Sequence, residues 1–213
     1  MLLPTGKNQR LRYIVFSSMN NKKIYAGIGS RKTPSATLAI IKKLAGLLER
    51  EGWLLRSGGA DGADTAFEQG VMDPRHRAIF LPGDWFNERR AGSGGFYDST
   101  KLPGWEKALK TVDHFHPAPN NLSPFARKLM ARNAMQILGP NLSHPADLVI
   151  TWTEMGLRKG GTGQVLRIAE EYKIKVINLG SPFYSNLIEG VQSGINAEYV
   201  VIQKVMEQCW QHP

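Results

Sequence analysis

The chain alternates short apolar runs with segments in which apolar residues recur every three or four positions. The short runs are typical of buried strands, and the recurring pattern is typical of helices. Strands are predicted at about residues 24–28, 53–56, 78–81, 147–152 and 175–179. Helices are predicted at about residues 35–51, 64–70, 125–138, 163–172, 184–192 and 198–209.

Strands that are separated by helices favour parallel pairing with right-handed crossovers. The pattern therefore predicts an α/β fold, a Rossmann-like doubly wound, mostly parallel sheet with helices on both faces. Residues 24–213 form a single domain in this interpretation. It has a long insertion at about 83–124, rich in Gly, Pro, Asn and Ser, with a short helix from Trp105 to Val112. If the first strand is central, its following loop lies between those of the second and fourth strands, where ligands of such sheets bind.

The composition is that of a globular protein that needs no disulfide or metal. Of the 213 residues, 42% are hydrophobic and 21% are charged. Cys209 is the single cysteine, which excludes a disulfide framework and a zinc site with two thiolates. No apolar run approaches the roughly 18 residues of a membrane span, and the N-terminus lacks the order of a signal peptide. We expect a cytoplasmic protein without a membrane partner, metal or cofactor.

The net charge is +9, from 27 Lys and Arg against 18 Asp and Glu, and it is unevenly distributed. Residues 1–23 carry five basic residues and no acid, whereas the remainder carries 22 basic and 18 acidic residues. This basic N-terminal arm can grip phosphates without sequence specificity. It can equally be a flexible, solvated extension.

The loop after the first predicted strand contains Gly27, Gly29, Ser30 and Arg31. Glycine lets backbone N–H groups approach an anion, and the start of the following helix adds partial positive charge. Arg31 can hold a phosphate in a bidentate fork. A tight turn between strand and helix explains the two glycines equally well.

The loop after the second predicted strand contains Ser57, Gly58 and Gly59, followed by two acids, Asp61 and Asp64. The first three can line an anion pocket. Either acid can cap the helix, accept a hydrogen bond from a ribose hydroxyl, or act as an acid or base. Capping is favoured for Asp61, because Asp is a leading N-cap residue.

The loop after the fourth predicted strand contains Gly160, Gly161, Thr162 and Gly163. Three glycines between a strand and a helix favour a phosphate-binding role over turn geometry alone. Trp152, at the end of the strand, can stack on a base or pack in the core.

Two of these loops resemble motifs of the DNA-processing protein A (DprA) family. Residues 29–31 match its Gly-Ser-Arg turn, and residues 57–64 are similar to its strand end S-G-x-A-x-G-I-D. Arg132 and Asn133 match an Arg-Asn pair on a later helix of that family. The resemblance covers about 24–180. It implies a domain of the SLOG superfamily that binds single-stranded DNA or a nucleotide, and it places Arg132 and Asn133 near the ligand.

The same superfamily holds the cytokinin-activating phosphoribohydrolases (LOG), whose motif P-G-G-x-G-T-x-x-E ends in a catalytic Glu. No Glu occurs there, where Leu166 and Arg167 follow the glycines, which argues against the same hydrolysis. The resemblance therefore favours a binding protein over an enzyme. The alternative is a nucleoside or nucleotide N-glycosidase, or a phosphoribohydrolase-type enzyme, that uses Asp61, Asp64 or Glu68 as its carboxylate.

Arg127 and Arg132 share a broad face of one predicted helix, and both are candidate phosphate ligands beside Arg31. A structural role for Arg132, paired with an acid, is the competing interpretation.

A second copy of the chain is a further expected partner, because the C-terminal segment is more apolar than a terminal surface helix requires. A helix packed into the core explains the same residues equally well. They are Ile188, Val191, Val200, Val201, Val205 and Met206.

Overall fold

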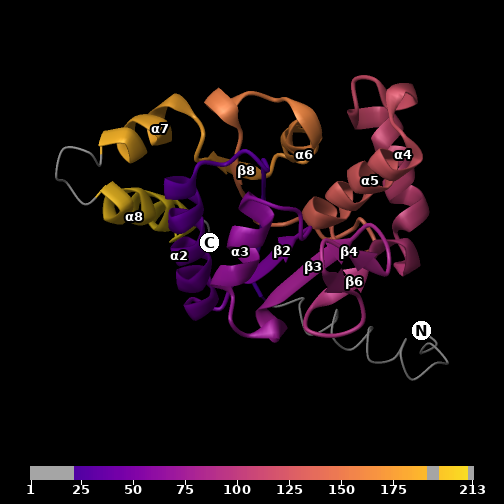
Figure 1. The fold of residues 1–213 in the computed structure, drawn as a ribbon, viewed down its shortest axis with the longest axis horizontal. Coiled ribbons are helices and arrows are strands. Elements are labelled where there is room, and N and C mark those ends of the chain that lie inside the picture. Colours follow the sequence, from indigo (N-terminus) through magenta and orange to yellow (C-terminus); the bar gives the residue numbers. More distant parts are fainter. Residues whose placement is uncertain (1–21, 191–196, 211–213) are drawn as a thin grey trace.

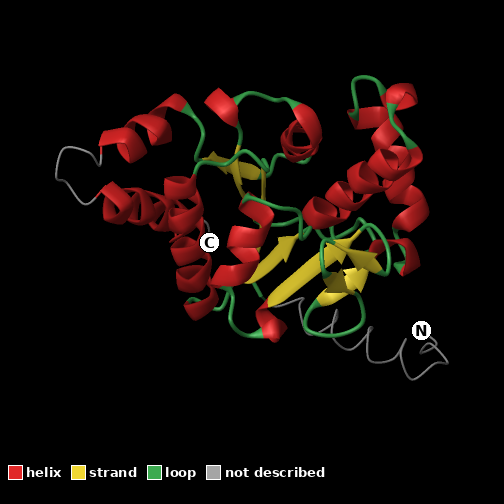
Figure 2. Ribbon diagram, viewed as in Figure 1, coloured by secondary structure: helices red, strands yellow, loops and turns green. Residues whose placement is uncertain are grey.

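The computed structural model describes residues 22–190 and 197–210, so most of the predicted N-terminal arm and Val191 lie outside the described residues (Figure 1). Six strands form one parallel sheet in the order β6-β3-β2-β1-β7-β8. Helices cover both faces of this sheet, which confirms the predicted Rossmann-like α/β fold (Figure 2). The strands are β1 (Ile24–Gly29), β2 (Leu54–Ser57), β3 (Arg77–Leu81), β6 (Phe96–Asp98), β7 (Leu148–Trp152) and β8 (Lys175–Asn178).

The strand order reverses beside β1. The chain adds strands on one side of β1 as far as β6 and then crosses to the other side for β7 and β8. Tyr25 of β1 therefore lies opposite Leu55 of β2 and Leu148 of β7. The sequence left the position of β1 open, and its central place opens a crevice at the carboxyl ends of β1 and β7.

Alternate residues of β1 belong to two hydrophobic cores, because successive side chains of a strand point to opposite faces. Tyr25 packs with Leu44 and Phe67 of the helices on one face. Ala26 packs with Ala134 of the helices on the other face. The helices are α2 (Ser35–Arg50), α3 (Ala63–Gly70), α4 (Trp105–Phe115), α5 (Pro124–Leu138), α6 (Gly160–Glu171), α7 (Pro182–Glu189) and α8 (Ala197–Trp210).

The segment 83–124 is more ordered than the sequence predicted. Its β6 pairs with β3 and forms an edge of the main sheet. β4 (Trp85–Phe86) and β5 (Arg89–Arg90) form a separate antiparallel hairpin. The sequence predicts none of these three strands, because two or three residues are too few to show a period. The predicted short helix is present as α4, which continues to Phe115 and packs against α5.

The C-terminal helix α8 lies beside α2 (Figure 1). Val201, Val205 and Met206 are buried in the same core as the α2 side chains. Packing within one chain thus explains three of the residues that led us to expect a homodimer, and the homodimer stays a prediction without their support. In the described part of the chain, no helix is long and apolar enough to span a membrane.

We expect Val205→Ala to lower the free energy of unfolding by about 2 kcal/mol, because it removes two buried methyl groups and leaves a small cavity. Chemical denaturation measures this change. Gln203→Ala is the matched control, since Gln203 is exposed on the same helix. The opposite result is that Val205→Ala leaves the stability unchanged and that light scattering shows a dimer dissociating to a monomer. That result would place α8 in a dimer interface.

Candidate functional site

A pocket of about 590 Å³ lies at the carboxyl ends of β1 and β7, in the crevice where the strand order reverses. Its walls come from the loops after β1 and β7, the loop that leads into α3, the β4–β5 hairpin, the first half of α5 and the start of α6. Its volume is within the range of about 300–1,000 Å³ that is usual for small-molecule sites. The pocket is therefore where the topology of a doubly wound sheet favours a ligand.

Ten of the candidate residues line this pocket. They come from four segments that are far apart in the sequence, and the fold brings them together. They are Gly29, Ser30, Arg31, Asp61, Asp64, Arg132, Asn133, Gly160, Gly161 and Thr162.

Gly27 and Ser57 do not line the pocket, because both belong to the packed interior. A Cβ added to Gly27 would lie 2.6 Å from Cγ of Phe67. The Ser57 hydroxyl donates a hydrogen bond of 2.7 Å to the carbonyl oxygen of Gly27. These two residues thus set the spacing of β1, β2 and α3.

Gly58 and Gly59 also do not line the pocket, because arginine side chains lie against them. A Cβ added to Gly58 would lie 1.3 Å from Nη1 of Arg132, and one added to Gly59 would lie 2.9 Å from Cδ of Arg89. The glycines of this loop therefore leave room for side chains of the same chain.

Three further candidates lie away from the pocket. Arg127 forms an ion pair with Asp113, at 2.5 Å between Nη2 and Oδ1. Gly163 lies inside the first turn of α6, where an added Cβ would be 2.6 Å from the carbonyl oxygen of Arg158. Glu68 forms an ion pair of 2.7 Å with an arginine of the hairpin.

A buried ion pair between Asp64 and Arg132 forms the floor of the pocket. Arg132 Nη1 lies 3.4 Å from Asp64 Oδ2, and the two residues are 4% and 2% exposed. The Asp64 carboxylate also accepts hydrogen bonds from the amides of Gly29 and Ala60, at 3.2 and 3.4 Å. One carboxylate thereby ties α5, the end of β1 and the loop before α3 together. The competing, structural interpretation of Arg132 has direct support in this pair.

Burial has opposite effects on the pKa values of the pair. It raises the pKa of Asp64 and lowers the pKa of Arg132, because each charge is held away from water. The charge of Asp64 opposes the shift at Arg132, whereas the positive charge of Arg31 lowers that pKa further. The floor of the pocket therefore has more positive charge than the one carboxylate balances.

The rim of the pocket is cationic. Arg31, Lys32 and Lys159 are exposed, and within the part of the chain that the structure describes, they form no ion pair. Lys159 is the N-cap of α6 and its side chain does not cap the helix. The first amides of α6, at Gly160 and Gly161, therefore point their N–H groups and the positive end of the helix dipole toward the rim. This combination can hold an anion.

The hairpin forms a wall of the pocket that the sequence analysis did not predict. Phe86 and Asn87 line the pocket. Arg89 fastens the hairpin to α3, because its Nε donates a hydrogen bond of 2.7 Å to Glu68. Asn87 and Glu88 both have positive φ, 51° and 61°, as a tight two-residue turn between antiparallel strands requires. In the sequence, Asn87 was the residue that could have indicated this turn, since Asn tolerates positive φ best after Gly.

One side of the pocket is apolar. The rings of Phe86 and Phe125 have centroids 6.2 Å apart, and 54% of Phe125 remains exposed. Leu129, Met130 and Leu157 continue this side. An exposed aromatic ring beside a cationic rim can accept the face of a base.

One expectation for the site was wrong, and one open alternative is now decided. The N-cap of α3 is Gly62 and not Asp61, whose carboxylate accepts a hydrogen bond of 2.8 Å from Asn87 Nδ2. Trp152 is 8% exposed and packs in the core rather than facing a ligand. Glu154 is a lining residue that the analysis missed. Among residues 22–190 and 197–210, no three His, Cys, Asp or Glu residues are placed to hold a metal ion.

Comparison with known proteins identifies solved structures with a similar fold and does not establish a function. No protein-family model and no curated protein matches the sequence. The solved structure of DNA processing protein A from Helicobacter pylori matches with a TM-score of 0.54 and 17% identity, over 90% of this chain and 84% of that one. A Moco carrier protein from Chlamydomonas rheinhardtii matches with a TM-score of 0.43 and 15% identity, over 88% and 97% of the two chains. The resemblance to DNA-processing protein A noted in the sequence thus extends to the fold.

We expect Arg132→Ala to lower the free energy of unfolding by about 3–5 kcal/mol, because it leaves Asp64 buried without its counter-charge. As a phosphate ligand alone, Arg132 would contribute little to folding, whereas its burial against Asp64 predicts a large contribution. Thermal and urea unfolding measure the effect. Arg127→Ala, on the same helix, is the control, since an exposed pair contributes about 0–1 kcal/mol. Equal stability of the two variants would show that the pair does not hold the floor in place.

Proposed function

We propose that this chain binds the phosphate group of a nucleotide, either free or within single-stranded DNA, at the rim of the pocket. The observation that carries the proposal is the group of cations without ion-pair partners among the described residues, Arg31, Lys32 and Lys159, beside the uncapped start of α6. Each of these elements attracts an anion, and together they surround one opening. The glycine-rich loops at the carboxyl ends of β1 and β7 supply this rim.

The electrostatics of the floor support the same proposal. Arg31 and Arg132 repel one another, and Asp64 is the counter-charge that Arg132 contacts. A dianionic phosphate between Arg31 and the start of α6 relieves this repulsion. The phosphate oxygens also accept the bidentate hydrogen bonds that a guanidinium donates.

The shape of the pocket indicates a ligand larger than phosphate alone. Its volume of about 590 Å³ leaves room for a sugar and a base, and its apolar side carries the exposed ring of Phe125. A cationic rim next to an aromatic surface is the combination that proteins use for nucleotides and for single strands. The structurally similar Helicobacter pylori protein is described by its single-stranded DNA binding mode, and a single strand is accordingly one of the two ligands proposed here.

A second candidate function is cleavage of an N-glycosidic bond, favoured by the two exposed carboxylates, Asp61 and Glu154, that line the pocket. Of the other carboxylates considered from the sequence, Asp64 is held by three donors and Glu68 by Arg89. Release of free base from a nucleoside monophosphate, followed by chromatography, tests this candidate. Wild-type protein that releases no base in the presence of bound nucleotide would exclude it.

We expect Arg31→Ala to weaken the binding of adenosine 5′-monophosphate and of a short single-stranded oligonucleotide by about 10–100-fold. It removes a charged hydrogen-bond donor to phosphate, which contributes about 1.5–3 kcal/mol. Isothermal titration calorimetry measures both affinities. Because Arg31 is exposed, the melting temperature should not change.

Arg50→Ala is the matched control, since Arg50 is an exposed arginine at the end of α2. A single strand that binds through several phosphates should also lose affinity with salt, at a log–log slope of about −0.7 for each phosphate neutralised. Arg31→Ala protein that binds both ligands like the wild type, or wild-type protein that binds neither, would refute the proposal.

A further inference from the structure

We propose that Asp61 and Asn87 form a hydrogen-bond-accepting edge of the pocket that recognises the ribose hydroxyls of the ligand, so that the site selects ribonucleotides over deoxyribonucleotides. This inference rests on the proposed function, because it assigns the sugar that belongs to the bound phosphate. It concerns the side of the pocket that the β4–β5 hairpin and the loop before α3 form.

The hydrogen bonds between the two residues leave oxygen atoms as the unused groups. Asn87 Nδ2 donates to the carbonyl oxygen of Gly59 at 3.1 Å and to Asp61 Oδ1 at 2.8 Å, which uses both of its hydrogens. Asp61 Oδ2 and Asn87 Oδ1 accept no hydrogen bond from any described residue, and both residues line the pocket. This edge therefore offers acceptors and no side-chain donor.

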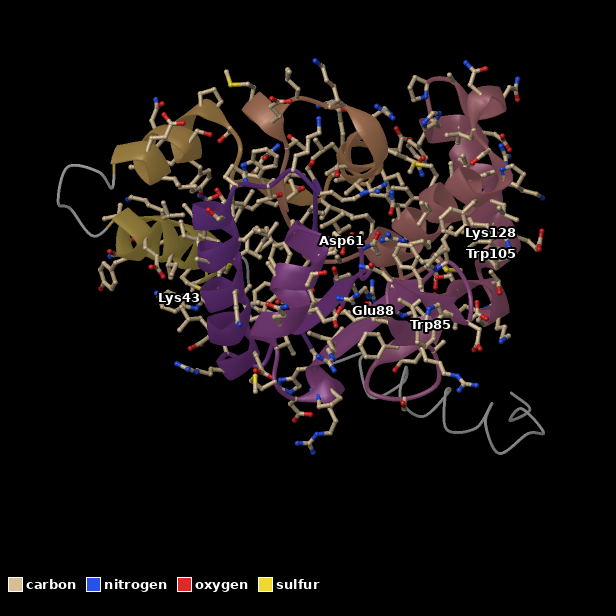
Figure 3. All side chains as sticks on the ribbon, in the orientation of Figure 1. Lys43, Asp61, Trp85, Glu88, Trp105 and Lys128 are labelled. Carbon is tan, nitrogen blue, oxygen red and sulfur yellow. The ribbon has the colours of Figure 1, made fainter. Side chains whose placement is uncertain are left out.

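Helix capping does not account for Asp61. The N-cap position of α3 is Gly62, and no side chain caps the helix there. Figure 3 labels Asp61 and the hairpin residue Glu88, and Asn87, which precedes Glu88, donates its hydrogen bond to Asp61. The hairpin thus holds the Asp61 carboxylate at the pocket, in an exposed position.

The position of Asp61 relative to Arg31 points to the sugar. A Cβ added to Gly62, the next residue, would lie 2.8 Å from Cα of Arg31, so the two loops touch. A phosphate at Arg31 places its directly bonded sugar beside the loop of Asp61, and the base one unit further away. The 2′- and 3′-hydroxyls of ribose are the donors that a carboxylate and an amide oxygen can accept together.

The same carboxylate disfavours a continuing DNA backbone. A second phosphate next to Asp61 would bring two negative charges together, which costs free energy at short range. When a ligand binds, the Asp61 carboxylate loses hydrogen bonds to water. Deoxyribose lacks the 2′-hydroxyl that would replace one of them. Both effects act in the same direction, toward a ribonucleoside phosphate rather than a DNA strand.

The test compares adenosine 5′-monophosphate with its 2′-deoxy and 3′-deoxy analogues by calorimetry on the full chain. We expect a missing hydroxyl to weaken binding about tenfold where it contacted the Asp61 carboxylate, and by roughly three- to tenfold where it contacted the neutral amide of Asn87. Guanosine, inosine and cytidine 5′-monophosphates form the second arm. If Asp61 and Asn87 instead accept hydrogen bonds from the N–H groups of a base, the affinity will differ between bases and will not change when a hydroxyl is removed. That result would show that the inference is wrong.

Asp61→Asn separates recognition from folding. Its Oδ1 can still accept the hydrogen bond from Asn87, so the hairpin contact remains, whereas its new amide group is a donor that cannot accept a hydroxyl proton. We expect adenosine 5′-monophosphate to bind about tenfold more weakly and its 2′-deoxy analogue to change little. Inorganic pyrophosphate should bind as tightly as to the wild type or tighter, because a negative charge has left the pocket.

Glu88→Gln is the control, because Glu88 is an exposed acid in the same turn and does not line the pocket. It removes the same charge from the same neighbourhood, and ribose selectivity should persist. If adenosine 5′-monophosphate binds but its deoxy analogues bind equally well, the inference fails and phosphate binding stands. If no nucleotide or pyrophosphate binds to the wild type, the proposed function fails with it.

Discussion

The buried contact between Arg132 and Asp64 is the interaction on which the pocket depends. The Arg132 guanidinium lies where a side chain of residue 58 would otherwise be, 1.3 Å from an added Cβ. Its partner carboxylate accepts amide hydrogens from the end of β1 and from the loop before α3. Helix α5, strand β1 and the α3 loop are therefore held by one pair of charges at the point where the strand order reverses. Burial works against both charges and raises the pKa of Asp64, and the charge of Arg132 and the two amide hydrogen bonds oppose that shift.

The sequence was sufficient to predict the sheet apart from its edge strand β6, and to name ten of the residues that line the pocket. Apolar runs such as residues 147–152 are long enough to show a strand, and strands alternating with helices allow few topologies. The hairpin is a different case. Its strands have two residues each, and its position depends on contacts of Arg89 with Glu68 and of Asn87 with Gly59, all distant in the sequence. Local patterns contain no information on such contacts, so one wall of the pocket could not be predicted.

Glycine was the least specific signal in the sequence. A missing side chain permits close approach by any neighbour, and the neighbour is not always a ligand. At Gly27 it is the ring of Phe67, and at Gly58 it is Arg132. At Gly160, by contrast, nothing lies within 4 Å of an added Cβ, and φ is +60°, so this glycine serves the conformation that begins α6 at the rim. Glycine-rich loops that are alike in sequence thus have packing roles after β2 and an exposed role after β7.

The distribution of charge within the pocket constrains how a ligand can lie in it. Arg31, Lys32 and Lys159 are at one end, whereas Asp61 and the oxygen of Asn87 are on the side formed by the hairpin. Phe86 and Phe125 occupy a third side. A molecule with an anion, a group of hydroxyls and a flat apolar ring satisfies all three sides in one orientation. One nucleotide unit of a DNA strand can occupy all three sides of the pocket. The phosphate of the next unit would then lie close to the Asp61 carboxylate. The hairpin is therefore the element that would distinguish a small nucleotide from a strand, and it belongs to the segment that carries no motif of the family that the rest of the chain resembles.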